Sequence, residues 1–134
     1  MNVKRYVLAA LGVFVFLFVF EYLWHGVGMQ GLYKQTASVW RPEKEMNQLF
    51  HWVIITQLAF AFVFAFIFTR NYEGKGLGEG FRYGVYMGLF MAVMQVGIYP
   101  YLPIPFSIAA AWFVGSLVAG IGGGVLLSLI YRDS

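Results

Sequence analysis

Four long runs of apolar residues dominate the chain and limit what it can fold into. A helix needs about 20 apolar residues to cross the hydrocarbon core of a bilayer. The expected spans cover residues 6–24, 50–69, 81–102 and 106–131. Inside hydrocarbon every backbone amide needs a partner within its own segment, so each run should be helical. The sequence therefore predicts an all-α membrane protein, a single domain of residues 1–134 with four transmembrane helices in a bundle.

The composition excludes a water-soluble domain of this length. The chain is 60% hydrophobic and only 11% charged, whereas about a quarter of the residues in a soluble domain carry a charge. The absence of cysteine excludes disulfides, thiolate metal sites and cysteine catalysis. No nucleic-acid motif or basic cluster is present, so we expect no nucleic-acid partner. The opening MNVKR could begin a signal peptide, but no small-x-small pattern follows Phe20, which favours an uncleaved first helix.

Lysine and arginine are divided unevenly between the connections. The two ends of the chain and the connection at 70–82 together hold six of them, whereas the connection at 25–49 holds three. Cytoplasmic segments of membrane proteins carry the excess of basic residues. The distribution therefore predicts that both termini are cytoplasmic.

The long first connection has an amphipathic pattern at residues 31–41. The residues expected on its apolar face are Leu32, Tyr33, Thr36, Val39 and Trp40. Lys34, Ser38 and Arg41 fall on the opposite face. This pattern predicts a short interfacial helix between the first two spans, lying in the plane of the membrane surface.

Small residues mark where the helices should approach one another, because lipid offers helices no hydrophobic reason to associate. The predicted packing positions are Gly84, Gly88, Gly115, Ala119, Gly120 and Gly124. The Gly-rich connection after residue 70 lacks the Lys-Ser/Thr of a phosphate-binding loop. We expect a flexible hinge there.

Polar side chains gather in the outer half of the predicted bundle, while its inner half is nearly all apolar. The candidate ligand-binding residues are Glu21, His25, His51, Gln57, Gln95 and Tyr99. Polar and ionisable groups at such depths usually face the bundle interior. This asymmetry predicts a site that opens outward.

Three interpretations of these residues stay open. Glu21, His25 and His51 offer one carboxylate and two imidazoles, which could bind a divalent metal, and apart from this possibility we expect no cofactor. The same set could instead bind a small polar molecule or a lipid headgroup. In the plainest interpretation Glu21 lies at headgroup level, paired with Lys34 or Arg41, and the histidines bind nothing.

No catalytic set is recognisable, because the spans contain no Ser-His-Asp order, no HExxH motif and no pair of carboxylates. We therefore expect no enzymatic activity. The leading hypothesis is a non-catalytic accessory or assembly subunit that contacts the bilayer and packs against other membrane proteins or copies of itself. The aromatic runs FVFLFVF and FAFVFAFIF and the small-residue faces favour it. The alternative is an outward-facing binding or transport protein for a metal or a small polar ligand.

Several motifs, spread over most of the chain, carry a resemblance. They are EYLWHG, YKQTASVWRPEKEM, YEGKGLGEGFRYG, and AWFVGSLVAG after the proline-rich turn. Together they resemble an uncharacterised family of small four-helix bacterial inner-membrane proteins. The resemblance implies the four-helix fold and a location in the bacterial inner membrane, and it implies no activity.

Overall fold

The computed structural model describes residues 1–132, and the regular structure in that range is entirely helical. The α-helices are α1 (Val3–Glu21), α2 (Gln30–Gln35), α3 (Glu43–Gln48), α4 (Phe50–Arg70), α5 (Leu77–Val96) and α6 (Phe106–Ile130). A π-helical segment at Tyr22–Gly28 continues α1, and short 3₁₀ turns lie at Ala37–Val39 and Tyr99–Tyr101. The all-helical class predicted from the sequence is confirmed for the described residues.

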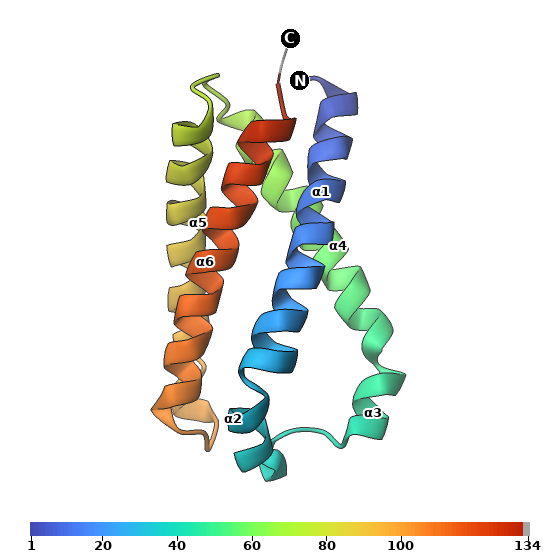
Figure 1. Cartoon of the computed structure of the whole chain (residues 1–134), viewed down its shortest axis with the longest axis vertical. Coiled ribbons are helices and arrows are strands. Elements are labelled where there is room, and N and C mark those ends of the chain that lie inside the picture. Colours follow the sequence, from blue (N-terminus) through green and yellow to red (C-terminus); the bar gives the residue numbers. More distant parts are fainter. Residues whose placement is uncertain (133–134) are drawn as a thin grey trace.

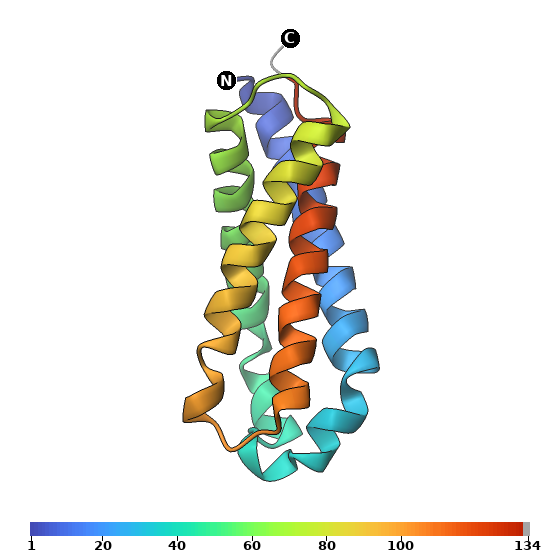
Figure 2. The ribbon, with the colours of Figure 1, turned by 90° about the vertical axis from the view of Figure 1, so that its left-hand side faces the viewer.

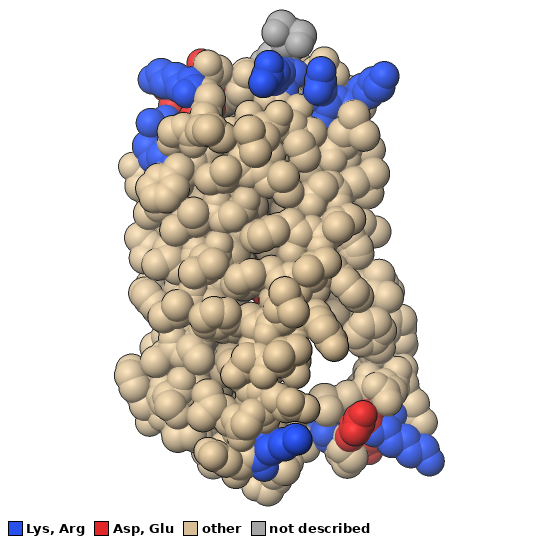
Figure 3. All heavy atoms as spheres, in the orientation of Figure 1, with Lys and Arg blue, Asp and Glu red and all other residues tan. Residues whose placement is uncertain are grey.

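Four helical segments are long and apolar enough to cross a membrane, as predicted. They are Val3–Gly28, Phe50–Arg70, Leu77–Tyr101 and Phe106–Ile130. The first begins three residues before the predicted start and, through the π-helical segment, ends four residues later. The third begins at Leu77, four residues before the predicted start, because the helix begins directly after Gly76. In Figure 3, Lys and Arg lie at the two ends of the molecule, and the face between them is almost free of charge.

The long helices run side by side along the long axis (Figures 1 and 2). α5 packs along α6, and α1 packs on both α4 and α6. The N-terminus, residue 132 and the turn at 71–76 lie at one end, which we call the terminal end (Figure 1). The opposite end, here the α2 end, holds α2, α3 and the turn between α5 and α6. Every residue from 41 to 56 is exposed, so α3 and the first turns of α4 stand apart from the other helices.

Helices α5 and α6 meet at a line of buried glycines. Gly84 and Gly88 on α5 face the segment of α6 that contains Gly120 and Gly124. A Cβ added at Gly84 would lie 2.5 Å from the carbonyl oxygen of Gly120, and one at Gly88 would lie 2.9 Å from that of Leu117. These are backbone atoms that cannot turn aside, so the spacing of the two helices depends on the missing side chains.

The other two predicted packing positions face α1 and its neighbours. Gly115 lies under the indole of Trp24, whose N–H donates to the carbonyl oxygen of Ala111 at 3.0 Å. Ala119 is 3% exposed and belongs to the main apolar core near the terminal end, which also contains Val13 and Phe64.

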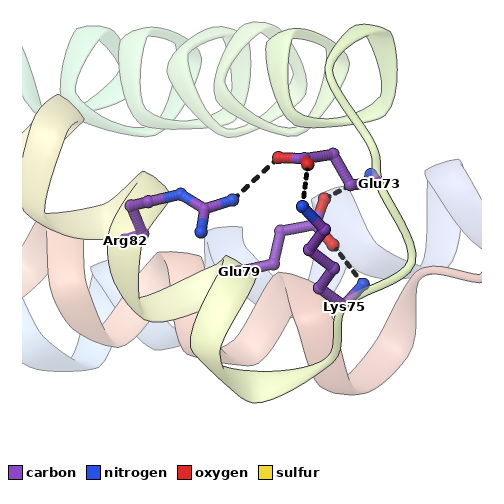
Figure 4. A network of polar contacts seen from close by, with 4 residues as sticks. All are labelled: Glu73, Lys75, Glu79 and Arg82. Atoms are coloured by element: carbon purple, nitrogen blue, oxygen red, sulfur yellow. Dashed lines mark hydrogen bonds and ion pairs between the residues drawn. The ribbon is translucent and has the colours of Figure 1, made fainter.

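The turn between α4 and α5 is held by a buried carboxylate (Figure 4). Glu79, on the first turn of α5, is 4% exposed and accepts hydrogen bonds from the backbone N–H groups of Glu73 at 2.6 Å and Lys75 at 2.7 Å. The Glu73 carboxylate pairs in turn with Lys75 and Arg82. The hydrogen bond and the charge of Lys75, aided by Arg82, lower the pKa of Glu73. The structure thus ties down a turn for which glycine content predicts a flexible hinge.

Candidate functional site

A cavity of about 350 Å³ lies among the four long helices, and we call it the polar cavity. The residues that line it are Leu17, Glu21, Thr56, Gln57, Phe60, Met91, Gln95, Ser116 and Ala119. Three of the predicted ligand-binding residues, Glu21, Gln57 and Gln95, are therefore brought together from α1, α4 and α5. No lysine or arginine lines this cavity, so its single full charge is the carboxylate of Glu21.

A side hollow of about 280 Å³ adjoins the polar cavity between α1 and α4. Glu21 and Gln57 line both spaces. The hollow is otherwise bordered by residues such as Tyr22, Phe50 and Val53, which are exposed on the surface of the molecule. The two polar side chains thus stand between the cavity and a lateral approach from the apolar surface.

Glu21 and His25 form a hydrogen-bonded pair where α1 changes into the π-helical segment. The Nε2 atom of His25 lies 2.8 Å from Oε2 of Glu21, and about a third of each side chain is exposed. On its other side, Nδ1 of His25 lies 2.7 Å from the hydroxyl oxygen of Tyr33 on α2. The indole N–H of Trp112 on α6 donates to the same hydroxyl at 2.8 Å. These four side chains, from three parts of the polypeptide, thus form one continuous hydrogen-bond network.

One assignment of protons satisfies every hydrogen bond in this network. Because an indole N–H can only donate, the Tyr33 oxygen accepts from Trp112 and gives its own proton to Nδ1 of His25. His25 then carries a hydrogen on Nε2 and donates it to the Glu21 carboxylate. Burial raises the pKa of Tyr33; the Trp112 hydrogen bond opposes this shift, and the charge of Glu21 adds to it. Tyr33 therefore remains a donor at neutral pH.

The same network would also accommodate a hydrogen on each ring nitrogen of His25. Both ring nitrogens then donate, and the Tyr33 oxygen accepts from His25 and from Trp112. The Tyr33 proton turns to Sδ of Met29, which lies 3.6 Å away. Neither arrangement of hydrogens leaves one of these four side chains without a hydrogen-bonding partner.

Gln57 carries the one unsatisfied buried polar atom found in the side chains of the described residues. Its Oε1 is enclosed and accepts no hydrogen bond. An unpaired buried acceptor costs about 1–3 kcal/mol. The terminal torsion of a glutamine side chain is broad, so a turn of the amide could bring this oxygen to a donor in the cavity that Gln57 lines. The Gln57 amide oxygen is thus a hydrogen-bond acceptor that no protein group in the described residues uses.

Two predicted site residues lie elsewhere. The ring of His51, an exposed residue, lies tilted beside that of Trp52, with ring centroids 5.6 Å apart. Tyr99 packs edge-on against Phe106 at 5.6 Å, next to the small second core at the α2 end. Neither residue lines the polar cavity. Within residues 1–132 no three His, Asp or Glu side chains form a group that could hold a metal ion, so the divalent-metal hypothesis stays a prediction from sequence.

The plainest interpretation of Glu21 is wrong in its pairing. Glu21 pairs with His25 and lines the polar cavity, whereas Arg41 lies 3.7 Å from Glu45 on the surface. The hydrogen bond between Tyr33 and Trp112 could not be predicted from the sequence, because no spacing rule connects residues 79 positions apart. Their apolar surroundings indicated packing alone.

The comparisons add no relative. No family model, curated protein or solved structure matches this chain. The resemblance to the uncharacterised four-helix family stays a prediction.

Proposed function

We propose that the chain is a multi-pass protein of the bacterial inner membrane, with its four long helices bundled in the bilayer and both termini in the cytoplasm. The distribution of basic residues supports this orientation, since six lie toward the terminal end and three toward the α2 end. In this orientation α2 lies at the outer interface, where Trp40 and Trp112 belong to an aromatic belt. The polar cavity then lies in the outer half of the bilayer.

Within that setting, the protein binds a small organic cation in the polar cavity and does not catalyse a reaction. The observation that carries this proposal is a carboxylate, Glu21, lining a cavity together with an amide whose oxygen, in Gln57, has no partner. Both groups can accept a hydrogen bond from a ligand, and the carboxylate also attracts a positively charged ligand. A carboxylate can accept about four hydrogen bonds, so the His25 bond does not exhaust it.

A primary ammonium with a short apolar body matches this lining. The ammonium has three N–H donors, and Glu21, Gln57 and Gln95 offer three acceptors from three helices. The Phe60 ring and the Met91 thioether supply apolar and polarisable walls, and an aromatic face attracts a cation. The hydrogen bond from His25 orients the carboxylate and leaves the negative charge in place.

Calorimetric titration of the purified protein in detergent micelles tests this function, with phenethylammonium as the probe. We expect binding at pH 7 and no measurable binding of the neutral analogue 2-phenylethanol. Glu21→Gln and Gln57→Leu should each weaken binding by about ten- to a hundredfold, since hydrogen bonds to charged groups contribute about 1.5–3 kcal/mol. Glu45→Gln and Gln48→Leu make the same changes at exposed positions and should leave affinity unaltered.

Two results would overturn the cation proposal. Equal affinity for 2-phenylethanol would show that charge is irrelevant to binding. Failure of phenethylammonium, methylammonium and butylammonium to bind the wild-type protein would remove the proposed ligand class altogether.

An accessory or assembly role is the second candidate, and a separate observation favours it. The first turns of α4 expose large apolar side chains around the helix, among them Trp52, Ile54 and Ile55. A helix of another membrane protein, or of a second copy, could pack there. Isolation from native membranes in mild detergent tests this role, and a protein recovered strictly alone would contradict it.

A further inference from the structure

A second space, separate from the polar cavity, lies at the α2 end. This groove has a volume of about 670 Å³ and runs between α2, the start of α3 and the first turns of α6. We call it the interfacial groove. The lining residues that matter here are Gln30, Lys34, Trp40, Arg41, Glu43 and Trp112. Figure 3 shows basic and acidic side chains next to one another at this end of the molecule.

The basic side chains that line the interfacial groove are not held in strong ion pairs. Lys34 is exposed and makes no ion pair within the described residues. Arg41 lies 3.7 Å from Glu45, and both side chains are more than half exposed, so this pair holds Arg41 only weakly. Glu43 is the one acidic residue in the lining. Two positive charges and one negative charge leave a net charge of +1, which complements a monoanion.

The walls of the groove are aromatic and fixed in place. The rings of Trp40 and Trp112 meet edge-on at 6.2 Å, and Tyr33 meets Trp40 at 5.5 Å. Both indole N–H groups are already used, by Thr36 at 2.9 Å and by Tyr33 at 2.8 Å. The indoles therefore present apolar surface to the groove rather than hydrogen-bond donors. Its lining suits a molecule with one negative charge beside an apolar body.

We propose that the interfacial groove binds the headgroup of an anionic phospholipid, a phosphate diester with a single negative charge. Lys34 and Arg41 approach the phosphate from the α2 and α3 sides, and the amide of Gln30 supplies a hydrogen bond. The glycerol and the first methylenes lie on Trp40 and Trp112. This site uses a different ligand charge and different charged residues from the polar cavity, so it stands or falls independently of the ammonium proposal.

Binding of phospholipids to the purified protein in dodecylmaltoside micelles tests this site, followed by tryptophan fluorescence. The probes are phosphatidylglycerol, zwitterionic phosphatidylcholine and soluble glycerol 3-phosphate. We expect phosphatidylglycerol to bind more tightly than the other two. Each basic residue should contribute about fivefold in affinity, so Lys34→Gln with Arg41→Gln should weaken phosphatidylglycerol binding by roughly thirtyfold.

A matched double variant and a charge reversal complete the test. Lys44→Gln with Arg70→Gln removes two positive charges outside the groove and should leave the preference for phosphatidylglycerol intact. Lys34→Glu with Arg41→Glu should abolish that preference. Equal binding of phosphatidylglycerol and phosphatidylcholine would overturn the proposal, as would equal losses in the two neutralising double variants. Binding of glycerol 3-phosphate as tight as that of the lipid would also overturn it, because the site would then recognise a free phosphate.

Discussion

The close approach of α5 and α6 makes a sharp prediction for Gly84→Ala. The added methyl carbon would lie 2.5 Å from the carbonyl oxygen of Gly120 and 2.6 Å from the Cα of Ile121. Ordinary contacts between such atoms are at 3.5–4.0 Å. Helix α5 must therefore move away from α6 by about 1 Å, and the neighbouring contact at Gly88 opens with it.

The magnitude follows from two opposing effects. Overpacking of a close-packed contact costs about 1–3 kcal/mol. Replacing glycine by alanine within a helix also stabilises it by roughly 0.5–1 kcal/mol. Gly78→Ala, on the same helix, isolates the second effect, because a Cβ there has no atom within 4 Å. We therefore expect Gly84→Ala to be less stable than Gly78→Ala by about 1–3 kcal/mol.

Unfolding of the purified variants in mixed micelles, with increasing sodium dodecyl sulfate and helicity as the readout, measures this difference. Gly78→Ala should equal or slightly exceed the wild-type stability, whereas Gly84→Ala should unfold at lower denaturant. If the two variants unfold together, α5 and α6 do not meet at these glycines, and the packing described above is incorrect.

Four further predictions concern ionisable groups. Tyr33→Phe removes the hydroxyl between two ring nitrogens and should lower the free energy of unfolding by about 1–3 kcal/mol in the same titration. Because the pKa of Tyr33 is raised above its ordinary value of 10.0, its contribution is complete below pH 10 and should decline as the pH rises further, and Tyr33→Phe should reduce that decline. The pKa of Glu73 is lowered from 4.5, so its contribution is present above that pH and should be lost on acidification below it; thermal unfolding of Glu73→Gln should show no such loss. Zinc sites use three or four protein ligands, and His51 lies apart from the pair of Glu21 and His25; equilibrium dialysis should find no stoichiometric zinc, and zinc bound by the wild type but lost in Glu21→Ala would contradict this.

The spans were predictable because apolar content over about 20 residues is a local property of the sequence. The ends of the spans were less predictable. The first span continues to Gly28 through the π-helical segment, and no residue in YLWHGVG announces a change from one backbone hydrogen-bonding pattern to another. The hydrogen bonds of the turn at 71–76 were also not predicted. Its glycines indicated freedom, whereas Glu79, six residues beyond Glu73, supplies the carboxylate that binds the turn.

The candidate site was predicted in part, and the pattern of success has a physical reason. Hydropathy gives the depth of a residue in the membrane, and Glu21, Gln57 and Gln95 were chosen by depth. Depth does not say which way a side chain points around its helix. His51 has a similar depth to Glu21 but lies on the first turn of α4, where the helix stands apart from the others and every residue is exposed. The spread of α4 depends on the whole packing of the chain, which no local pattern encodes.

The polar groups of the cavity also argue against a bundle made for packing alone. A partly buried carboxylate paired with another ionisable side chain is weak support for stability, since apolar residues of similar size often serve as well or better. Glu21 and His25 form such a pair, and Gln57 adds an acceptor that has no partner. Apolar side chains at these positions would stabilise the helices more. Departures from local packing rules are expected where a protein performs its function, and here Glu21 and Gln57 line the same cavity while His25 is bonded to Glu21. That coincidence is why we place ligand binding ahead of a purely structural role.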